Sequence, residues 1–358
     1  MNTGFSLYCA NGYETNAEVV AKAKAAGCRY AFTSLHIPEE EGIDYRAETV
    51  RLLKLCKDAG IDLIADISPV TLRKLGITDF TGLEELGITY VRLDFGFSAK
   101  ETVALSKRFH IVFNASTISH EDIIAWQAAG ADFARFTACH NFYPKRFSAL
   151  SLERVAKINE RLKTQGFQTM AFVPGETYRG PLHEGLPTVE SHRGDTGDKL
   201  VCDMLALYDA TTDVVMIGDS DVSHEVWNRM RQLGENCLEI RAKLSPEYEY
   251  LYDRDQHDRP DSSEYLIRSQ ESRLWDDAPV YGPTGKPVES PVESAVESVP
   301  VGTVLVSNSA YGRYAGELSI ARTELPLDVR DTVAGHVVAA DMAFLPYLHS
   351  GRGFKLIR

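Results

Sequence analysis

The first 234 residues alternate between short apolar runs and longer amphipathic stretches. The apolar runs predict strands at residues 5–9, 30–35, 62–67, 90–95, 111–116, 133–137, 168–173 and 213–218. The stretches between them, such as YRAETVRLLKLCKDAG, repeat apolar residues every three or four positions and end at a glycine, which predicts amphipathic helices. Strands that are each followed by a helix indicate an α/β fold, the parallel (β/α)8 TIM barrel. An open doubly wound sheet is the main alternative.

The pattern changes after residue 235. Six segments then read as strands separated by turns: NCLEIRAKL, EYLIRS, GTVLVSNSAYG, AGELSIARTEL, TVAGHVVAAD and GFKLIR. Among them lies KPVESPVESAVESVP, a tandem repeat whose acidity, serines and prolines predict an exposed loop. We therefore expect a catalytic TIM-barrel domain at residues 1–235 and a smaller β-rich domain at residues 236–358.

Charge and cysteine usage narrow the class of protein. The 358-residue chain has a formal net charge of -13, which repels the phosphates of DNA, RNA and anionic membranes, so neither nucleic acid nor a membrane is expected as a partner. The early segment GFSLYCANG is too short and too polar for an export or spanning helix. The six cysteines are scattered without a CxxC pair, which favours reduced thiols in a cytoplasmic protein. No GxGxxG or P-loop motif follows the first strand, and we expect no cofactor.

Polar residues gather where the predicted barrel strands end, the edge at which TIM barrels carry their chemistry. A single polar residue at such a position is usually a structural hydrogen bond, but so many at one edge favour a site. We expect one catalytic pair among them rather than a set of catalysts. The residues at these strand ends are His36, Asp66, Asp94, Asn114, His140, Asn141, Tyr143, Glu176 and Asp219.

Two carboxyl groups in unlike environments suit general acid/base chemistry, of which glycoside hydrolysis is one example. The predicted pair is Asp94 and Glu176, with Asp66 and Asp219 as rivals. Glu176 follows Pro174-Gly175, so we expect it to project unpaired into the mouth with a raised pKa, as a general acid must. Asp94 is expected to stay ionised beside Arg92.

The remaining polar residues suit recognition of a sugar. His36, Asn114, His140 and Asn141 are expected to bind sugar hydroxyls or an acetamido group, and Tyr143 and Phe142 to stack on a ring. Cations in the loops after the sixth and seventh strands predict a phosphate site, although a solvated ion-pair network is an equal alternative: Lys145, Arg146, Arg179, His183, His192 and Arg193. A metal site would need His36, Asp66, His140 and Asp219 to converge, but no HxH or HExxH spacing is present, so no metal is expected.

Several of these segments together resemble the 6-phospho-N-acetylmuramidase family. They include FTSLHIPEE, VRLDFGFS, HNFYPKR, AFVPGETYRGPLHEGLPTVESHR, VMIGDSD and NSAYGRYAGELSIARTEL, and the resemblance covers nearly the whole chain. It implies a TIM barrel followed by a cyclophilin-like β domain, in a cytoplasmic glycosidase of peptidoglycan recycling. The implied substrate is the disaccharide of N-acetylmuramic acid 6-phosphate and N-acetylglucosamine. The Val-Glu-Ser repeat is the chief departure from the family.

The prediction is therefore a phosphosugar glycosidase whose partner is a small phosphorylated amino-sugar disaccharide. A phosphosugar lyase or isomerase and a non-catalytic phosphoglycan-binding sensor are the alternatives. In the second domain, the Gly-flanked stretch NSAYGRYAGEL predicts that Tyr311 and Arg313 contact the ligand as that domain covers the barrel mouth. A turn exposed away from the barrel is the competing interpretation.

Overall fold

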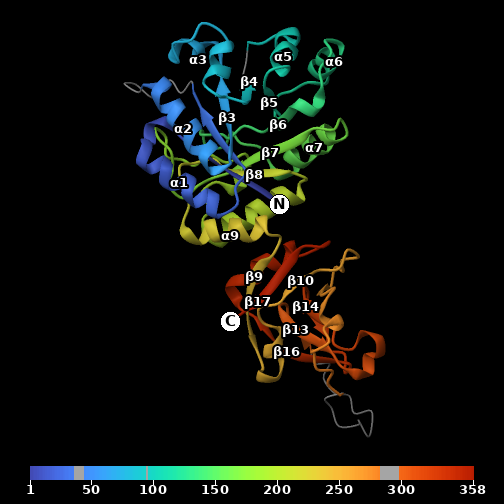
Figure 1. Ribbon diagram of the computed structural model, residues 1–358. Coiled ribbons are helices and arrows are strands. Elements are labelled where there is room, and N and C mark those ends of the chain that lie inside the picture. Colours follow the sequence, from blue (N-terminus) through green and yellow to red (C-terminus); the bar gives the residue numbers. More distant parts are fainter. Residues whose placement is uncertain (36–43, 94–95, 283–297) are drawn as a thin grey trace. The chain divides into compact units, whose positions relative to one another are not determined.

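A closed barrel of eight parallel strands, paired in chain order, forms the first part of the chain, with helices around its outside (Figure 1). The computed structural model describes residues 1–35, 44–93, 96–282 and 298–358. By internal contacts the chain divides into two units, Met1–Gly234 and Glu235–Arg358, and the barrel is the first. The predicted TIM barrel is confirmed, and the open doubly wound sheet is excluded because β1 (Asn2–Ser6) pairs with β8 (Val214–Ile217).

The remaining strands fall close to their predicted places. They are β2 (Tyr30–Ser34), β3 (Asp62–Ile67), β4 (Tyr90–Leu93), β5 (His110–Asn114), β6 (Phe136–Cys139) and β7 (Gln168–Val173). The prediction for β6 was wrong by three residues at its start, because Phe133–Arg135 forms a 3-10 helix whose preceding residue, Asp132, accepts a hydrogen bond from the Ala134 amide. β1 also begins and ends earlier than predicted, and Cys9, the last residue of the predicted strand, begins another short 3-10 helix, Cys9–Asn11.

The helices begin and end where local sequence signals require. They are α1 (Tyr13–Ala25), α2 (Tyr45–Ala59), α3 (Pro69–Lys74), α4 (Thr81–Glu85), α5 (Ala99–Ser106), α6 (His120–Ala128), α7 (Leu152–Lys163), α8 (Gly197–Asp209) and α9 (His224–Gly234). The Asp44 side chain caps α2 by accepting from the Ala47 amide at 3.0 Å, and Gly60 ends that helix in the left-handed conformation that favours glycine. α5 and α6 begin with reciprocal capping boxes at Ser98 and Ser119.

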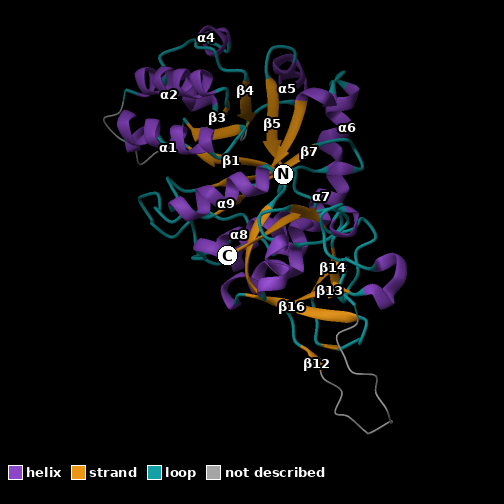
Figure 2. Ribbon diagram, turned by 60° about the horizontal axis from the view of Figure 1, so that its bottom comes forward, coloured by secondary structure: helices purple, strands orange, loops and turns teal. Residues whose placement is uncertain are grey.

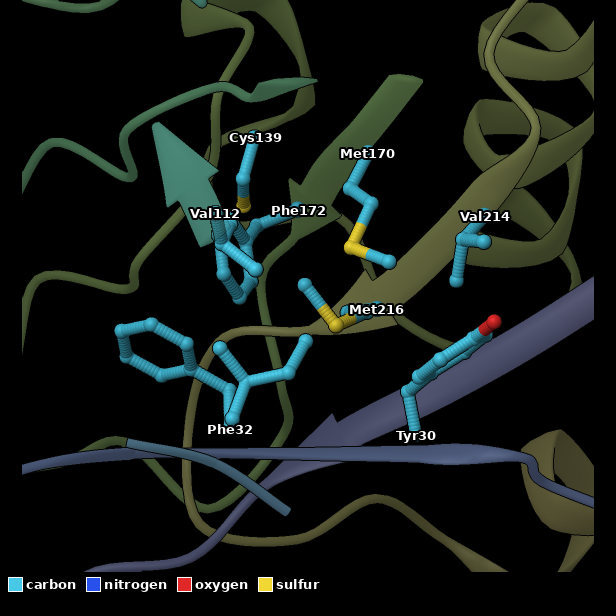
Figure 3. Close-up of a cluster of buried hydrophobic side chains, with 9 residues drawn as sticks. Tyr30, Phe32, Val112, Cys139, Met170, Phe172, Val214 and Met216 are labelled. Atoms are coloured by element: carbon cyan, nitrogen blue, oxygen red, sulfur yellow. The ribbon is translucent and has the colours of Figure 1, made fainter. Parts of the chain in front are cut away.

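Apolar side chains fill the barrel interior (Figure 3). This layer comprises Tyr30, Phe32, Ile64, Val112, Cys139, Met170, Phe172, Val214 and Met216. Cys139, the last residue of β6, is fully buried, and burial raises the pKa of its thiol to about 12. All six cysteines are free thiols. Tyr90 packs against this layer. Because strand side chains alternate, the residues two positions after Ile64, Tyr90, Val112 and Cys139 lie at the carboxyl edge of the barrel.

The second unit is a mixed sheet of seven strands in the order β10-β17-β9-β16-β13-β14-β11, and a separate two-stranded sheet pairs β12 with β15. Figure 2 shows β13, β14 and β16 of this sheet. The bounds are β9 (Leu238–Leu244), β10 (Asp255–His257), β11 (Leu266–Arg268), β12 (Ser298–Val299), β13 (Thr303–Ser307), β14 (Leu318–Ala321), β15 (Leu325–Pro326), β16 (Asp331–Val337) and β17 (Gly353–Ile357). The predicted β-rich domain is confirmed, whereas its likeness to cyclophilin stays a prediction. Most of the Val-Glu-Ser repeat lies outside the described residues.

Within the described parts of the chain, no helix is long and apolar enough to cross a membrane.

Candidate active site at the mouth of the barrel

A tier of polar side chains lies one step above the apolar interior at the ends of β3 to β6. Each member is two residues beyond an interior residue, and the tier consists of Asp66, Arg92, Asn114 and Asn141. Asp66 and Arg92 are also register partners in the β3–β4 ladder. The period of the strands therefore gathers these residues at the edge where a TIM barrel places its chemistry.

An ion pair and an amide form the centre of this tier. Arg92 Nη1 donates to Asp66 Oδ1 at 2.7 Å, and Arg92 Nη2 donates to the side-chain oxygen of Asn141. Asp66 and Arg92 are only 6% and 4% exposed, whereas Asn141 is half-buried. Two charges this deeply buried are tolerated when they are paired and hydrogen-bonded, as these are. Arg92 thus links a carboxylate to a partly exposed amide.

Next to Asn141, an aromatic floor lines the mouth. Phe142 packs edge-on against Phe32 and Phe172, with ring centroids 5.8 and 5.1 Å apart, and it also contacts Tyr8 and Leu186. Phe142 is half-buried, so part of its ring faces open space. Such a ring suits contact with the apolar face of a sugar. This role was predicted for both Tyr143 and Phe142, and of the two the Phe142 ring has the clearer geometry for it.

Arg179 is a cation whose charged group remains available at this mouth. Its guanidinium lies 4.7 Å above the ring of Tyr8, which is fully buried and donates its hydroxyl hydrogen to the carbonyl of Gly218. Its backbone amide is held by Asp219 Oδ1 at 3.0 Å. Among the described residues, no carboxylate lies within ion-pair distance of this guanidinium. An arginine fixed by stacking and by its own backbone, but lacking an anion, suits a phosphate.

Glu176 and Asp219 bind backbone amides rather than facing the mouth unpaired. Glu176 accepts from the amide of Gly197 at 2.7 Å and from the amide of Ser223, at the starts of α8 and α9. These two amides are among those that a helix N-terminus leaves without an intrahelical partner, so they attract a carboxylate. The expectation that Glu176 is unpaired is wrong.

Asp219 has three backbone donors: Gly175 and Leu186 at 2.9 Å to Oδ2, and Arg179 at 3.0 Å to Oδ1. The side chain is buried; burial raises the pKa of Asp219 while these N–H groups act to lower it. The loop lies very close to the strand end. A Cβ added to Gly218 would be only 2.3 Å from the Leu186 carbonyl oxygen. Asp219 therefore holds the loop after β7 against β8.

Arg193, predicted to bind phosphate, is saturated by the protein itself. It donates through Nε and Nη2 to Glu190, through Nη1 to the carbonyls of Glu184 and Gly185, and through Nη2 to the carbonyl of Tyr143 at 2.8 Å. The same ion pair lowers the pKa of Glu190 to about 2. The expected role of Arg193 is corrected, since its donors already tie the loop after β6 to the loop after β7.

His140 is likewise structural. Its ring is fully buried, with Nδ1 3.0 Å from Ser116 Oγ and Nε2 2.9 Å from Asn159 Oδ1 on α7. Because Asn159 Nδ2 already donates to Ala210 and Thr212, its oxygen accepts from His140 Nε2, and the imidazole is neutral. Burial lowers the pKa of His140 to about 4. The prediction that it binds substrate is wrong, because it follows the inward-facing Cys139 and so faces outward.

The other predicted recognition residues lie in varied settings. Asn114 is half-buried and accepts from the Ser116 amide at 2.9 Å. His183 is exposed and its Nδ1 lies 3.1 Å from the Tyr178 carbonyl oxygen, while Arg146 pairs with Glu184 at 2.5 Å. His192 is buried, with its Nε2 atom 3.6 Å from Asp203 Oδ1. Burial lowers the pKa of His192 to about 4. Asp94 and His36 lie outside the described residues and stay predictions.

Two cavities mark the opposite ends of the barrel wall. One of about 220 Å³ lies beside the mouth, between the ends of β4 and β5, and is lined in part by Leu93, Phe97, Asn114 and Trp126. A larger one of about 820 Å³ lies at the amino-terminal ends of β3 and β4, where TIM barrels do not carry chemistry. We therefore consider the smaller cavity, and not the larger one, as part of the candidate site. In residues 1–35, 44–93, 96–282 and 298–358, no three His, Cys, Asp or Glu side chains are placed to hold a metal ion.

In the second unit, Tyr311 and Arg313 lie on the 3-10 segment Ser309–Tyr314, next to arginines from other parts of the chain. Tyr311 donates to Asp328 at 3.0 Å, and Arg313 donates to the Tyr314 hydroxyl at 2.8 Å. The ring of Tyr314 also lies within 6.0 Å of the guanidinium groups of Arg268 and Arg273. Arg268 is already paired with Glu317 at 2.8 Å, and contact of Tyr311 and Arg313 with the ligand stays a prediction.

Comparison with known proteins agrees with this architecture. Residues 3–232 match the family model of the 6-phospho-N-acetylmuramidase N-terminal domain, and residues 237–357 match that of its C-terminal domain. The chain belongs to the 6-phospho-N-acetylmuramidase family. The family name denotes a glycosidase, and both domains of the family are present here in their usual order.

Two solved structures resemble the chain over its whole length. A conserved Enterococcus faecalis protein with an unknown function is 28% identical with a TM-score of 0.74, covering 100% of this chain and 96% of its own. An uncharacterized B. cereus protein is 25% identical with a TM-score of 0.73, covering 100% of this chain and 99% of its own. Among curated proteins, none matches the chain.

Proposed function

We propose that this protein is a cytoplasmic hydrolase that cleaves the disaccharide of N-acetylmuramic acid 6-phosphate and N-acetylglucosamine into its two sugars during peptidoglycan recycling. The family supports a glycosidase acting on a phosphorylated muramic acid. The barrel mouth supports the same substrate class, since it combines an aromatic floor, a half-buried amide and an available guanidinium. Phosphate, ring and N-acyl group would each meet a chemically matched side chain.

The observation that carries this proposal is the contrast between Arg179 and Arg193. Both lie in the loop after β7, a common position for phosphate sites in TIM barrels. Arg193 is consumed by Glu190 and by backbone carbonyls, whereas Arg179 stacks on Tyr8 with no carboxylate partner among the described residues. Arg179 is therefore our phosphate ligand.

Hydrolysis of a glycosidic bond calls for two carboxyl groups at the mouth. Glu176 and Asp219 are bound to backbone amides, so we replace Glu176 by Asp66 in the proposed catalytic pair. Arg92 stabilises the ionised form of Asp66, as a nucleophile or base requires. Asp94, immediately after β4, stays the proposed partner and would act as the acid.

The proposal is tested by assaying the phosphorylated and unphosphorylated disaccharides side by side. Charge-assisted hydrogen bonds contribute about 1.5–3 kcal/mol each, so kcat/KM should favour the phosphorylated substrate by roughly tenfold to a hundredfold or more. A sensor would bind the phosphorylated sugar and release nothing. A lyase or isomerase would give a product of different mass from the two free sugars.

A further inference from the structure

Asn141 presents a hydrogen-bond donor whose direction is fixed by its neighbours. A guanidinium has donors and no acceptor, so the Asn141 atom facing Arg92 Nη2 must be its oxygen. The NH2 group is thereby turned away from Arg92. The ion pair to Asp66 holds Arg92, and the Thr188 hydroxyl donates to the Asn141 backbone carbonyl at 2.9 Å, so both ends of Asn141 are anchored.

The NH2 group of Asn141 lacks an acceptor in the part of the chain that the structure describes. Asn141 is half-buried, and its neighbour Phe142 lends an apolar surface beside it. A fixed donor next to an apolar surface matches a group that pairs an acceptor with a methyl, as an acetamido group does. The triad of Asp66, Arg92 and Asn141 has no net charge, which favours a neutral carbonyl over a carboxylate or phosphate.

We propose that Asn141 forms the subsite that recognises the N-acyl carbonyl of the amino sugar, and that Arg92 is the positioning residue that orients it. This inference rests on the proposed function, because it takes the substrate to be a phosphorylated amino sugar. It assigns the Asp66–Arg92 pair a role in specificity in addition to the charge that it places at the mouth.

Asn141→Asp is the sharpest test, because the carboxylate keeps an acceptor for Arg92 and loses the donor. The substrates are the phosphorylated disaccharide and its de-N-acetylated analogue, which carries free amines. We expect kcat/KM for the acetylated substrate to fall at least about tenfold, since a hydrogen bond is replaced by a repulsive contact. The de-N-acetylated analogue should be cleaved as well as by wild type or better, because its ammonium pairs with the new carboxylate.

Two further arms complete the experiment. The first arm uses an acetylated analogue that lacks the lactyl carboxylate. Asn141→Asp should lower kcat/KM for this analogue by the same factor as for the acetylated parent. If the variant cleaves this analogue as fast as wild type does, Asn141 contacts the lactyl group instead. Asn228→Asp, which adds the same charge on the exposed face of α9, is the control and should change none of the rates.

Arg92→Lys tests the positioning role. Lysine keeps the charge opposite Asp66 but lacks the planar fork that serves two partners at once. The ratio of kcat/KM for the acetylated substrate to kcat/KM for the de-N-acetylated analogue should fall, whereas a purely structural or electrostatic role of Arg92 would lower both values equally and leave the ratio unchanged. If Arg92→Lys fails to fold, Asn141→Asp decides alone.

Equal losses on acetylated and de-N-acetylated substrates, or no loss on either, would overturn the subsite. Failure of the wild type to cleave any of the disaccharides would instead refute the proposed function, so the two outcomes are distinct.

Discussion

The two sides of the barrel mouth use their carboxylates differently. On the β3–β4 side, Asp66 binds the side chain of Arg92, which in turn orients Asn141. On the β7–β8 side, Glu176 and Asp219 bind backbone amides of helix starts and of a loop. A carboxylate bound to backbone stabilises a loop, whereas one bound to a side chain can leave a donor directed at a ligand. Acidic residues at equivalent strand ends thus have different roles: Asp66 belongs to the proposed site, whereas Glu176 and Asp219 stabilise loops and helix starts.

The largest expected effect falls on the β4 side of this comparison. Asp94→Asn removes a titrating carboxyl with little change of shape, so kcat should fall at least about a hundredfold, within the usual range for acid/base catalysis. The melting temperature should stay close to that of wild type. Glu176→Gln is the matched variant on the other side, and there the melting temperature should fall. Near-normal turnover in Asp94→Asn would remove Asp94 from the proposed pair.

The next effect separates the two arginines of the loop after β7. Arg179→Ala should raise KM for the phosphorylated disaccharide by roughly tenfold to a hundredfold, the equivalent of one charge-assisted hydrogen bond, and leave the unphosphorylated one unchanged. Arg193→Ala removes bonds to Glu190 and to backbone carbonyls, so it should lower the melting temperature and affect both substrates equally. The reverse pattern would show that Arg193 binds the phosphate.

A smaller effect, on stability, probes Asp219. Asp219→Asn puts an NH2 group against backbone donors, and each N–H left without an acceptor costs about 1–3 kcal/mol. Urea unfolding followed by tryptophan fluorescence measures this loss. Asp58→Asn is the control, because Asp58 and Lys54 form an ion pair in which both side chains are well exposed. The free energy of unfolding of this variant should scarcely differ from that of wild type. Equal stability of the two variants would contradict the loop-holding role of Asp219.

The last effect, on the pH dependence of stability, concerns His140, which faces outward on the β6 side. Burial lowers its pKa from 6.5 to about 4, so the folded state binds this proton more weakly than the unfolded state does. Its contribution to stability is complete above pH 6.5 and is lost as the pH falls toward 4. Between these values, the unfolding free energy of wild type should drop more steeply than that of His140→Gln, by up to about 1.4 kcal/mol per pH unit.

The pH comparison is made between wild type and variant because another buried group acts in the opposite sense. Burial and Asp195 raise the pKa of Asp203 to about 8, so its protonated form favours the folded state in this window. The Asp203 contribution is common to both proteins and cancels in the difference. Parallel pH profiles for wild type and His140→Gln would mean that His140 is not buried in its neutral form.

The barrel, the β-rich domain and the polar strand ends were predictable because each depends on local periodicity. The roles of the individual polar residues were harder to predict. A 3-10 turn shifts β6 by three residues, so the sequence did not reveal that His140 faces outward while Asn141 faces the mouth. The alternation from Cys139 would have separated them, had the strand end been known.

The partners of Glu176, Asp219 and Arg193 could not be predicted for a different reason. Glu176 binds the amide of Ser223, 47 residues away, and Asp219 binds that of Leu186, 33 residues away. Such contacts depend on how loops fold over the barrel edge, which periodicity does not encode. The basic residues of its loop suggest that Arg193 binds phosphate. Only the backbone carbonyls to which it donates reveal its structural role.

The central claim, hydrolysis of a phosphorylated amino-sugar disaccharide, is tested most directly by isotope incorporation. The phosphorylated disaccharide is incubated with the protein in water enriched in ¹⁸O, and the products are weighed by mass spectrometry as soon as they form. The account predicts two free sugars, with one ¹⁸O atom in the anomeric hydroxyl created at the cleaved bond. A released sugar that has lost the elements of water and carries no ¹⁸O, or a disaccharide recovered intact, would contradict it.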